Sequence, residues 1–523
     1  MTFGIAQPSE HLTQNWSVTK PVAQGRRGMV VSQCREASVV GAEVLEAGGS
    51  AADAAVATAL ALATAEPWNS GLGGIGFGVL REASGQVWSL DFGAVSPRGI
   101  RPEHFRLTGE ESPDIFGWPK VEADRNVRGP LSFCMPSAVA GLGRLHDAFG
   151  RLPWREVVAP AVKLARRGMA VDWFSTVKIS QMAHYLRLYD ETARIYLPNG
   201  LPPVGAEKGN PRFLSQGRLA ESLARLQDEG WQSFYRGGLA EVLAADLKEV
   251  GGVIDAEELT EVDATLTPAQ SVGWGKCRIF LPAPASAAPM LADVLAALKP
   301  GDLRDEQWFA SLARALLAAV QQRIKGISNS QTPEACESCT THLSVADGSG
   351  QMVALTNSLL GLMGSAVTLP RTGILMNNGM MWFDPRPGRP NSIAPGSRPS
   401  ANMLPIICDI GDGRTLALGA SGGRRILSAV TSCLADIAAF GMTPEQAAHA
   451  PRIDVSSVGE IVADRRLNDN VIGALAEVAK VALCEHAAAP LNFGCPSILM
   501  TEDGRAIGQP DVMTPWSAAT AAR

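Results

Sequence analysis

The sequence predicts an α+β fold in which helices and β-sheets are stacked in layers. Helical patterns dominate residues 130–250, whereas short alternating segments separated by turn residues follow one another after residue 340, and a helical pattern comes after them. A chain that places helices first and a run of strands afterwards typically packs sheet against helix. Hydrophobic residues make up 46% of the 523 residues and charged residues 19%, which supplies a large core and excludes a mainly disordered chain.

The first predicted elements are a strand and two helices. Residues 29–32 predict a short strand, and residues 36–47 predict a helix that ends at two glycines. Ser50, followed three residues later by Asp53, resembles a capping box that opens a second helix through residue 64. Pro67 ends that helix, because the residue before a proline avoids the helical region.

Residues 71–76 (Gly-Leu-Gly-Gly-Ile-Gly) match the GxGxxG pattern of dinucleotide-binding folds. In those folds the motif connects a strand to the helix that it opens. Here a helix precedes it, and two predicted strands, 77–80 and 87–92, follow it. We therefore expect a glycine turn that brings the backbone close to a ligand or to another strand.

The remaining elements alternate with polar loops. The expected helices are residues 138–149, 154–167, 287–298, 307–326 and 426–440. The expected later strands are residues 340–346, 352–359, 373–376, 403–409 and 415–419. A polar loop that contains Pro333 covers residues 328–339, and we expect it to be exposed.

Charge and apolar patterning argue against two classes of protein, nucleic-acid binders and membrane-spanning proteins. Lys plus Arg number 46 and Asp plus Glu number 52, so the net charge of −6 argues against a nucleic-acid binder. The N-terminus has no basic stretch followed by an apolar one, and the longest apolar run, residues 54–65, is too short to span a bilayer. A cytoplasmic protein without membrane contact is the expectation.

Nine cysteines, an odd number, fit reduced thiols better than a disulfide framework. Cys336 and Cys339 have CxxC spacing, but no second pair completes a zinc site and no βαβ pattern surrounds them. We expect ordinary cysteines in a loop, with no metal and no cofactor.

The residues Thr-Thr-His-Leu-Ser-Val at 340–345 open a predicted strand directly after the polar loop. Thr340, His342 and Ser344 would share one face of that strand. A chain break before Thr340 would give this residue an α-amine with a pKa of ~7.7–8.0, suited to activate its own hydroxyl. On these residues alone, an ordinary strand with two surface threonines remains the alternative.

Residues 419–425 (Gly-Ala-Ser-Gly-Gly-Arg-Arg) lie between a predicted strand and a predicted helix. The backbone N–H groups of Gly422 and Gly423 at a helix start would suit a developing oxyanion. Phosphate binding or a simple turn stays open for this segment.

Further segments match one family in order along the chain. They are residues 28–32, 45–55, 66–67, 70–74, 91–92, 136–141, 152–154, 377–378, 398–399, 422–423 with Arg425, and 450–452. Together with residues 340–345 they make the chain similar to the γ-glutamyltranspeptidase (glutathione hydrolase) family over nearly its whole length.

The resemblance implies an N-terminal-nucleophile hydrolase with a four-layer αββα sandwich, made as a precursor that cleaves itself. Residues 1–339 would form the large subunit and residues 340–523 the small one, intertwined in one body; a dimer of such pairs stays open. Thr340 would be the nucleophile. Thr341 and Ser358 match hydroxyls that the family places near it, and Gly422 with Gly423 matches its oxyanion-hole pair.

The chain departs from the family where glutathione-using members bind the glutamyl group. Gly93 stands in place of an Arg that binds the α-carboxylate, and Ala401 and Asn402 replace two serines. Trp382 replaces the acidic residue for the α-amine, and Leu360 replaces an Asn. Losing the Arg partner of a buried carboxylate costs several kcal/mol, so a glutamyl zwitterion should bind poorly.

The substitutions suggest a more apolar acyl pocket around Met380, Met381 and Trp382, although such residues are equally typical of a plain core. Arg424, Arg98 and Arg386 are the candidates for contacting a substrate carboxylate from a new direction, and the sequence does not place them.

We therefore expect a self-processing threonine amidohydrolase or acyltransferase that acts mainly by hydrolysis on a small-molecule amide. Relatives without the glutamyl-binding residues include amidohydrolases of oxo-acid amides and cephalosporin acylases, and either class is an alternative. An uncleaved scaffold protein and a thiol-based redox protein that uses the CxxC pair are two further hypotheses.

Overall fold

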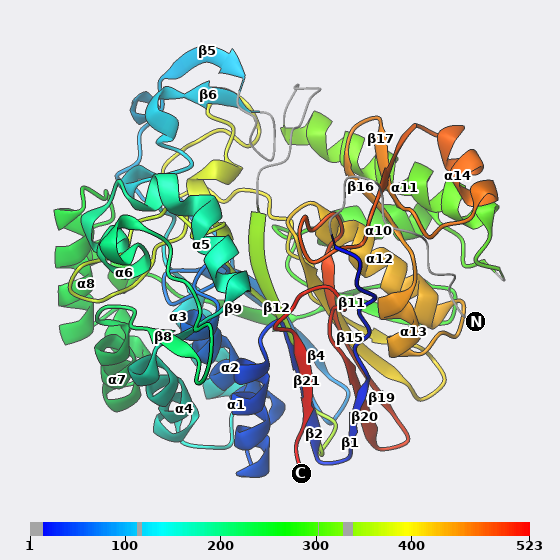
Figure 1. Ribbon diagram of the computed structural model, residues 1–523, viewed down its shortest axis with the longest axis horizontal. Coiled ribbons are helices and arrows are strands. Elements are labelled where there is room, and N and C mark those ends of the chain that lie inside the picture. The colour runs from blue at the N-terminus through cyan, green and yellow to red at the C-terminus, as the bar shows by residue number, and fades with distance from the viewer. Residues whose placement is uncertain (1–13, 112–117, 302, 328–337) are drawn as a thin grey trace.

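Two antiparallel sheets of seven strands each lie face to face, with helices on both outer faces (Figure 1). The computed structural model describes residues 14–111, 118–301, 303–327 and 338–523. The order of layers is helices, sheet, sheet, helices, which confirms the predicted α+β fold and the four-layer sandwich.

The first sheet is called the β12 sheet. Its strands, in spatial order, are β21 (Ala518–Ala521), β2 (Gly28–Ser32), β12 (Ser338–Asp347), β13 (Met352–Gly361), β3 (Ile75–Arg81), β4 (Val87–Phe92) and β9 (Thr265–Pro268). The second is called the β15 sheet. Its strands are β1 (Ala23–Gly25), β20 (Arg505–Gln509), β19 (Cys495–Glu502), β15 (Thr415–Ser421), β14 (Ile406–Asp409), β11 (Cys277–Leu281) and β10 (Gln270–Trp274).

Three smaller sheets lie outside the sandwich. They are β16 (Ile453–Ser457) with β17 (Glu460–Asp464) and β18 (Lys480–Cys484), β5 (Leu107–Glu111) with β6 (Pro119–Val121), and β7 (Met169–Val171) with β8 (Arg212–Leu214).

The helices divide between the two outer faces. Those from the first half of the chain are α1 (Arg35–Glu46), α2 (Ala51–Ala65), α3 (Ala138–Phe149), α4 (Trp154–Arg167), α5 (Trp173–Leu186), α6 (Asp190–Tyr196), α7 (Leu219–Glu229), α8 (Gly238–Glu249) and α9 (Ala256–Thr260). Those beside the β15 sheet are α10 (Ala288–Ala297), α11 (Glu306–Ile327), α12 (Arg425–Ala438), α13 (Pro444–His449) and α14 (Asp469–Ala476). Short 3₁₀ turns include η6 (Gly379–Trp382).

Helix α2 lies against the β12 sheet and is buried along its whole length. Its alanine-rich sequence allows this, because small side chains let α1 and α4 approach closely. A Cβ on Gly41 of α1 would come 2.2 Å from Oγ1 of Thr58 in α2. The predicted capping box is present: the Ser50 hydroxyl accepts from the Asp53 N–H at 3.1 Å, and Asp53 Oδ2 accepts from the Ser50 N–H at 2.9 Å.

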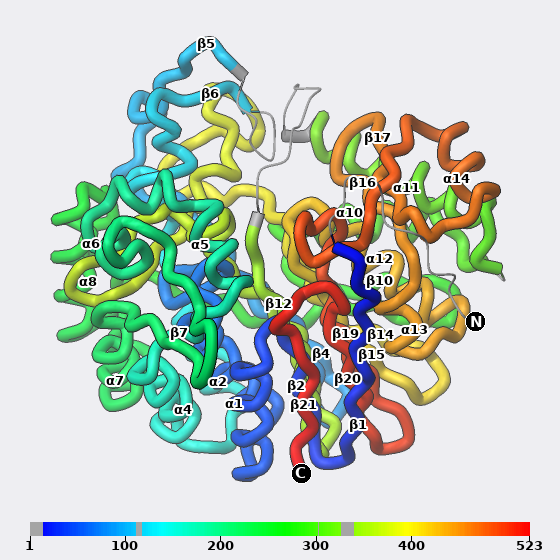
Figure 2. Tube along the Cα trace, in the orientation of Figure 1, coloured from blue at the N-terminus to red at the C-terminus, as the bar shows by residue number. Residues whose placement is uncertain are grey.

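Each sheet takes strands from before and after residue 340. In the β12 sheet, β12 pairs with β2 on one side and β13 on the other, and β13 continues to β3. In the β15 sheet, β1 at the N-terminal end pairs with β20 near the C-terminal end, which Figure 2 shows as a blue and a red segment side by side. The two halves of the chain are therefore interleaved in both sheets.

The glycine run at 71–76 forms the close approach that the sequence predicts. Gly73 makes a bridge to Met376, and a Cβ on Gly74 would lie 2.8 Å from the carbonyl oxygen of Ser358. On Gly76, a Cβ would lie 2.1 Å from the carbonyl oxygen of Thr356. Gly74 and Gly76 thus bring the backbone against β13, and Gly73 brings it against Met376.

The strand predicted at 373–376 is wrong. Leu375 and Met376 make only isolated bridges, and Gly373 has a φ of +68°, which breaks an extended run. Strands β9, β10 and β11 have no counterpart among the elements predicted from the sequence, and neither has β1.

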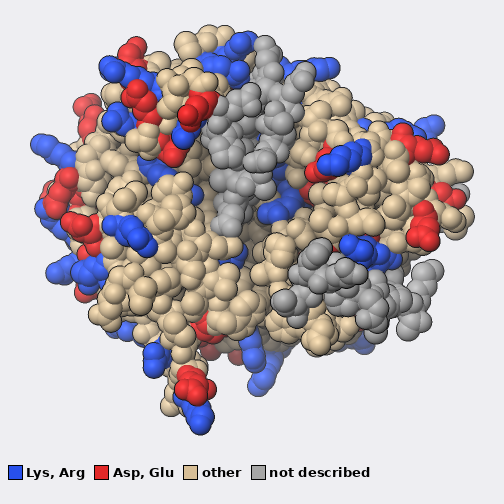
Figure 3. Space-filling view, turned by 45° about the horizontal axis from the view of Figure 1, so that its top comes forward, with Lys and Arg blue, Asp and Glu red and all other residues tan. Residues whose placement is uncertain are grey.

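None of the helices within the described ranges is both long and apolar enough to cross a membrane. Basic and acidic side chains are interspersed over the face drawn in Figure 3.

Candidate active site

Thr340 lies on β12 at a β-bulge. The pairs Cys339–Leu360 and Thr341–Asn357 flank it, so Thr340 alone faces the two residues Ser358 and Leu359 of β13. A bulge twists the strand and redirects side chains at one position without disturbing the ladder on either side.

Two hydroxyl groups meet the carbonyl oxygen of the residue before Thr340. The Thr340 hydroxyl donates to the Cys339 carbonyl oxygen at 2.7 Å, and the Ser358 hydroxyl donates to the same oxygen at 2.7 Å. The two hydroxyl oxygens are 3.2 Å apart, and both side chains are buried. The carbonyl oxygen of the peptide bond between Cys339 and Thr340 thus accepts from two hydroxyl groups, one of them on Thr340 itself.

The backbone of β13 holds Ser358 in this position. The Leu360 N–H donates to the Ser358 hydroxyl at 2.8 Å, and the Leu359 N–H leaves the ladder to donate to the Asn69 carbonyl at 2.9 Å. Leu360 has a φ of +84°, an uncommon conformation for a residue with a branched side chain. This conformation lies next to the bulge that faces Thr340.

His342 lies between the two sheets rather than at the reacting centre. Its ring nitrogens are 2.9 Å from Thr356 Oγ1 and 3.1 Å from Ser344 Oγ. Burial lowers the pKa of His342 to about 3, so the ring is neutral near neutral pH. The ring packs on Gly419, where a Cβ would come 2.2 Å from Cε1.

Strands β12 and β15 face one another where the two sheets pack together. The Ser344 hydroxyl contacts the Ala417 carbonyl, and His342 packs on Gly419.

Gly422 and Gly423 adopt positive φ angles of 118° and 62° before the first turn of α12. Arg425 holds this turn: its Nε donates to the Gly422 carbonyl at 3.1 Å, and it donates also to the Leu491 carbonyl. Gln33 donates to the Ser421 hydroxyl from the far end of the chain. The turn that carries the two glycines is therefore fixed from two directions.

Three of the predicted substrate residues lie in one buried apolar cluster. Leu360, Trp382 and Ala401 pack together with Met380 and with other apolar side chains that include Ile75, Phe77 and Met403. Leu360 and Ala401 are 2% and 1% exposed and Trp382 is 4% exposed, so this region is a packed core and not an open pocket.

Gly93 adjoins the same cluster, and side chains fill the space beside it. A Cβ on Gly93 would lie 2.6 Å from Cζ of Phe77 and 3.0 Å from a guanidinium nitrogen of Arg398. Arg398 in turn pairs with Asp91. An Arg side chain at position 93 would have no room.

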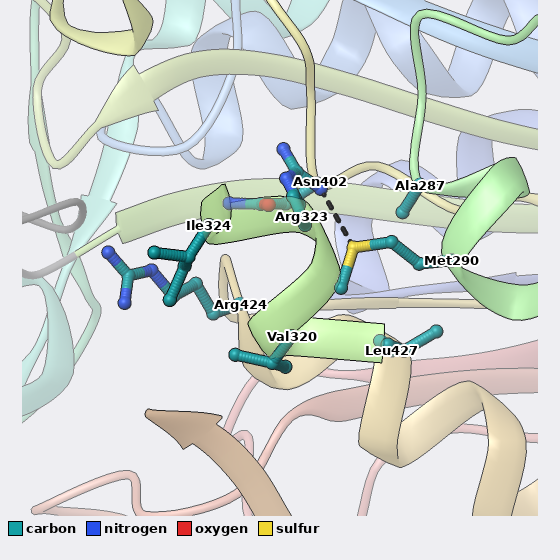
Figure 4. Close-up of a pocket in the computed structure, with 8 residues that line it drawn as sticks. All are labelled: Ala287, Met290, Val320, Arg323, Ile324, Asn402, Arg424 and Leu427. Carbon is teal, nitrogen blue, oxygen red and sulfur yellow. Dashed lines mark hydrogen bonds between the residues drawn. The ribbon is translucent and has the colours of Figure 1, made fainter. Parts of the chain in front are cut away.

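The three candidate arginines differ in their surroundings. Arg98 is exposed and pairs with Glu261, and Arg386 pairs with Asp384 at 2.6 Å. Arg424 donates to the Ser456 carbonyl at 3.2 Å and lines a pocket together with Asn402 (Figure 4).

Arg323 of α11 also lines this pocket and was missed by the sequence analysis. A basic residue near the end of a helix is expected from the helix dipole alone, so its position gave no signal.

The other predicted positions are less informative. The Thr341 hydroxyl is buried without a hydrogen-bond partner among the described residues. Cys336 lies outside the described residues, and Cys339 is buried on β12. Within the parts of the chain that the structure describes, no group of three or more His, Cys, Asp or Glu side chains could hold a metal ion.

The sequence matches the gamma-glutamyltranspeptidase family over residues 37–327 and 302–511. The chain belongs to this family. Among the relatives, it is 30% identical over 485 residues to the acylase ACY 1 proenzyme of a Pseudomonas species, covering 84% of each chain. It is 28% identical over 484 residues to the glutathione hydrolase proenzyme of Escherichia coli, covering 82% of this chain and 81% of the relative.

The fold is shared with the crystal structure of cephalosporin acylase from Bacillus halodurans, with a TM-score of 0.82 at 21% identity over 99% of both chains. As a member of the gamma-glutamyltranspeptidase family, the protein is an enzyme of the amidohydrolase and transpeptidase class.

Proposed function

We propose that this gamma-glutamyltranspeptidase-family enzyme is a self-processing threonine amidohydrolase for a non-glutamyl acyl group. The observation that carries the proposal is the contact of the Thr340 and Ser358 hydroxyls with the Cys339 carbonyl oxygen, each at 2.7 Å. This arrangement suits attack on the peptide bond that precedes Thr340.

Self-cleavage would proceed by an acyl shift. Thr340 Oγ1 attacks the Cys339 carbonyl carbon while the Ser358 hydroxyl stabilises the negative charge that develops on the oxygen. The C–N bond breaks, the Thr340 nitrogen takes up a proton, and an ester links Cys339 to the threonine oxygen. Water then hydrolyses the ester, which leaves Thr340 with a free α-amine.

The same residue would then act on substrates. The α-amine of Thr340 accepts the proton of its own hydroxyl, and the oxygen attacks the amide carbonyl of the substrate. The N–H groups of Gly422 and Gly423 stabilise the oxyanion, the amine leaves with a proton, and water releases the acyl group. His342 has no role as the base, because burial keeps it between the sheets in hydrogen bonds to Thr356 and Ser344.

The filled space around Gly93 supports a substrate other than a γ-glutamyl compound. Phe77 and Arg398 occupy the volume that a carboxylate-binding Arg would need, and Leu360 and Trp382 supply no charge. The two substrate classes proposed are therefore oxo-acid amides and cephalosporin-type amides. The relative named acylase ACY 1 proenzyme agrees with an acyl specificity of this kind.

Intact mass spectrometry of the purified chain tests the proposal. Incubation near neutral pH should yield two fragments that separate between Cys339 and Thr340. Thr340→Ala should remain one chain of 523 residues and hydrolyse no amide, whereas Thr340→Ser should still cleave. A cleaved and active Thr340→Ala protein, or a wild-type chain that stays whole, would show that the assignment of the nucleophile is wrong.

A further inference from the structure

Arg323, Asn402 and Arg424 line one pocket beside the candidate active site (Figure 4). Arg323 comes from the last turns of α11, Asn402 follows Ala401 of the apolar cluster, and Arg424 directly follows the glycine pair. The remaining walls are apolar side chains that include Met290 and Leu427.

Two of the polar groups have hydrogen-bond donors without partners. Asn402 is 7% exposed, and its Nδ2 is buried with no partner among the described residues. The Nε of Arg323 is likewise buried and unpartnered. A buried donor without an acceptor is destabilising, so a pocket with two of them among its lining residues is suited to an acceptor from outside the chain.

The positive charge of Arg323 is also uncompensated within the described parts of the chain. Arg323 forms no ion pair there, and its polar contacts are the Ser400 carbonyl at 3.2 Å and the Met290 sulfur at 3.1 Å. Burial and the nearby charge of Arg424 lower its pKa to about 10, which still leaves it charged near neutral pH.

We propose that this pocket binds a carboxylate of the amide substrate, with Arg323 and Asn402 as its donors, Arg424 beside them and an apolar chain against Met290 and Leu427. A guanidinium is the side chain best matched to a carboxylate, and the pocket contains no acidic residue. That the bound anion belongs to the substrate rests on the proposed function, whereas the binding of an anion does not depend on it.

The pocket is lined by residues other than Gly93, so the chain can lack the usual carboxylate-binding Arg and still bind a carboxylate elsewhere. The place of the usual Arg, at Gly93, is closed by Phe77 and Arg398. Arg323 reaches the site from a different helix, on the side of Asn402 and Arg424. The carboxylate would therefore lie in a different direction from the scissile bond than the α-carboxylate of a glutamyl group.

Calorimetric titration with two inert probes tests the pocket directly. Hexanoate and hexanamide have the same apolar chain, and only the first is an anion. We expect wild-type protein to bind hexanoate at least tenfold more tightly than hexanamide, and we expect Arg323→Gln to lose that preference. Arg225→Gln is the matched control, because Arg225 lies on the surface of α7 and pairs with Glu229 at 2.8 Å. Equal binding of the two probes, or a preference that survives Arg323→Gln, would overturn the proposal.

Asn402→Leu gives a second test that does not depend on the folding of the Arg323 variant. The change removes a buried donor without a partner, so the thermal midpoint should stay the same or rise while the affinity for hexanoate falls several-fold. A lower thermal midpoint together with unchanged hexanoate affinity would assign Asn402 a purely structural role and contradict the proposal.

Three anilides then identify which part of the substrate carries the carboxylate. Glutaryl 4-nitroanilide carries it on the acyl side, butyryl 4-aminobenzoate carries it on the amine side, and butyryl 4-nitroanilide carries none. The substrate whose kcat/KM falls about tenfold in Arg323→Gln, relative to butyryl 4-nitroanilide, identifies the side. If Arg323→Gln hydrolyses both carboxylate-bearing anilides with the kcat/KM of the wild-type protein, the pocket does not bind the substrate. If no anilide is hydrolysed although hexanoate binds, the proposed function fails and the anion site stands.

Discussion

Replacing Ser358 with Ala should slow self-cleavage far more than it destabilises the fold. The Ser358 hydroxyl is one of two donors to the Cys339 carbonyl oxygen, at 2.7 Å, and it accepts the Leu360 N–H at 2.8 Å. Removing one donor from a developing oxyanion costs about 100- to 1000-fold in rate. The Leu360 N–H loses its hydroxyl acceptor, which costs about 1–3 kcal/mol of stability.

The assay is a time course of intact mass at neutral pH, with thermal unfolding measured on the same samples. Ser344→Ala is the matched control, because Ser344 is also a buried hydroxyl of the β12 sheet, bonded to His342 at 3.1 Å, and it does not contact Cys339. We expect the control to lose similar stability and to cleave at the wild-type rate. Cleavage of Ser358→Ala at the wild-type rate, or an equal slowing of both variants, would refute the role of the paired hydroxyls.

Other predictions concern the substrate site and the buried ionisable groups. Gly93→Arg should lower the thermal midpoint and yield no glutamyl hydrolysis, because its side chain would clash with Phe77. Gly273→Arg serves as the control, because Gly273 is exposed and has open space around it. A gain of glutamyl hydrolysis in Gly93→Arg would contradict the argument. His342 has a pKa near 3 in the native state against 6.5 unfolded, so stability should fall by up to about 1.4 kcal/mol per pH unit as pH drops below 6.5. Denaturant titrations at a series of pH values should show that the free energy of unfolding of His342→Gln depends less steeply on pH over this range. Burial raises the pKa of Glu66 to about 7 from 4.5, so the stability that its protonated form provides should be lost as pH rises from 4.5 to 7. If the free energy of unfolding of Glu66→Gln depends on pH as steeply as that of the wild-type protein over this range, the prediction is refuted.

Local signals predicted the elements whose ends are set by short-range chemistry. The helices 138–149 and 154–167 have the predicted bounds, because their amphipathic patterns end at a glycine and begin after a proline or serine. Residues 373–376 failed because the positive φ of Gly373 interrupts the extended run. The edge strand β10 and its neighbour β11 were overlooked, although Cys277–Leu281 alternates buried with more exposed positions.

The candidate site could be predicted only in its residue types. The Thr340 motif and the glycine pair are visible in the sequence, but the bulge that opposes Thr340 to Ser358 and Leu359 depends on the pairing register of two strands. The crowding of Gly93 by Phe77 and Arg398 joins residues far apart in the chain, and no local pattern encodes it. Arg323 looks like any basic residue near a helix end until the pocket is seen.

The interleaving of the two chain halves in both sheets has a consequence for refolding after cleavage. A cut before Thr340 would leave the β12 sheet composed of strands from two separate chains, with β12 between β2 of one chain and β13 of its own. Neither chain alone could complete either sheet. The uncut polypeptide folds as a unimolecular process, whereas the cut form could reassemble only by a bimolecular encounter of two aggregation-prone pieces. Processing would therefore make unfolding effectively irreversible, and the lifetime of the mature enzyme would depend on its unfolding rate.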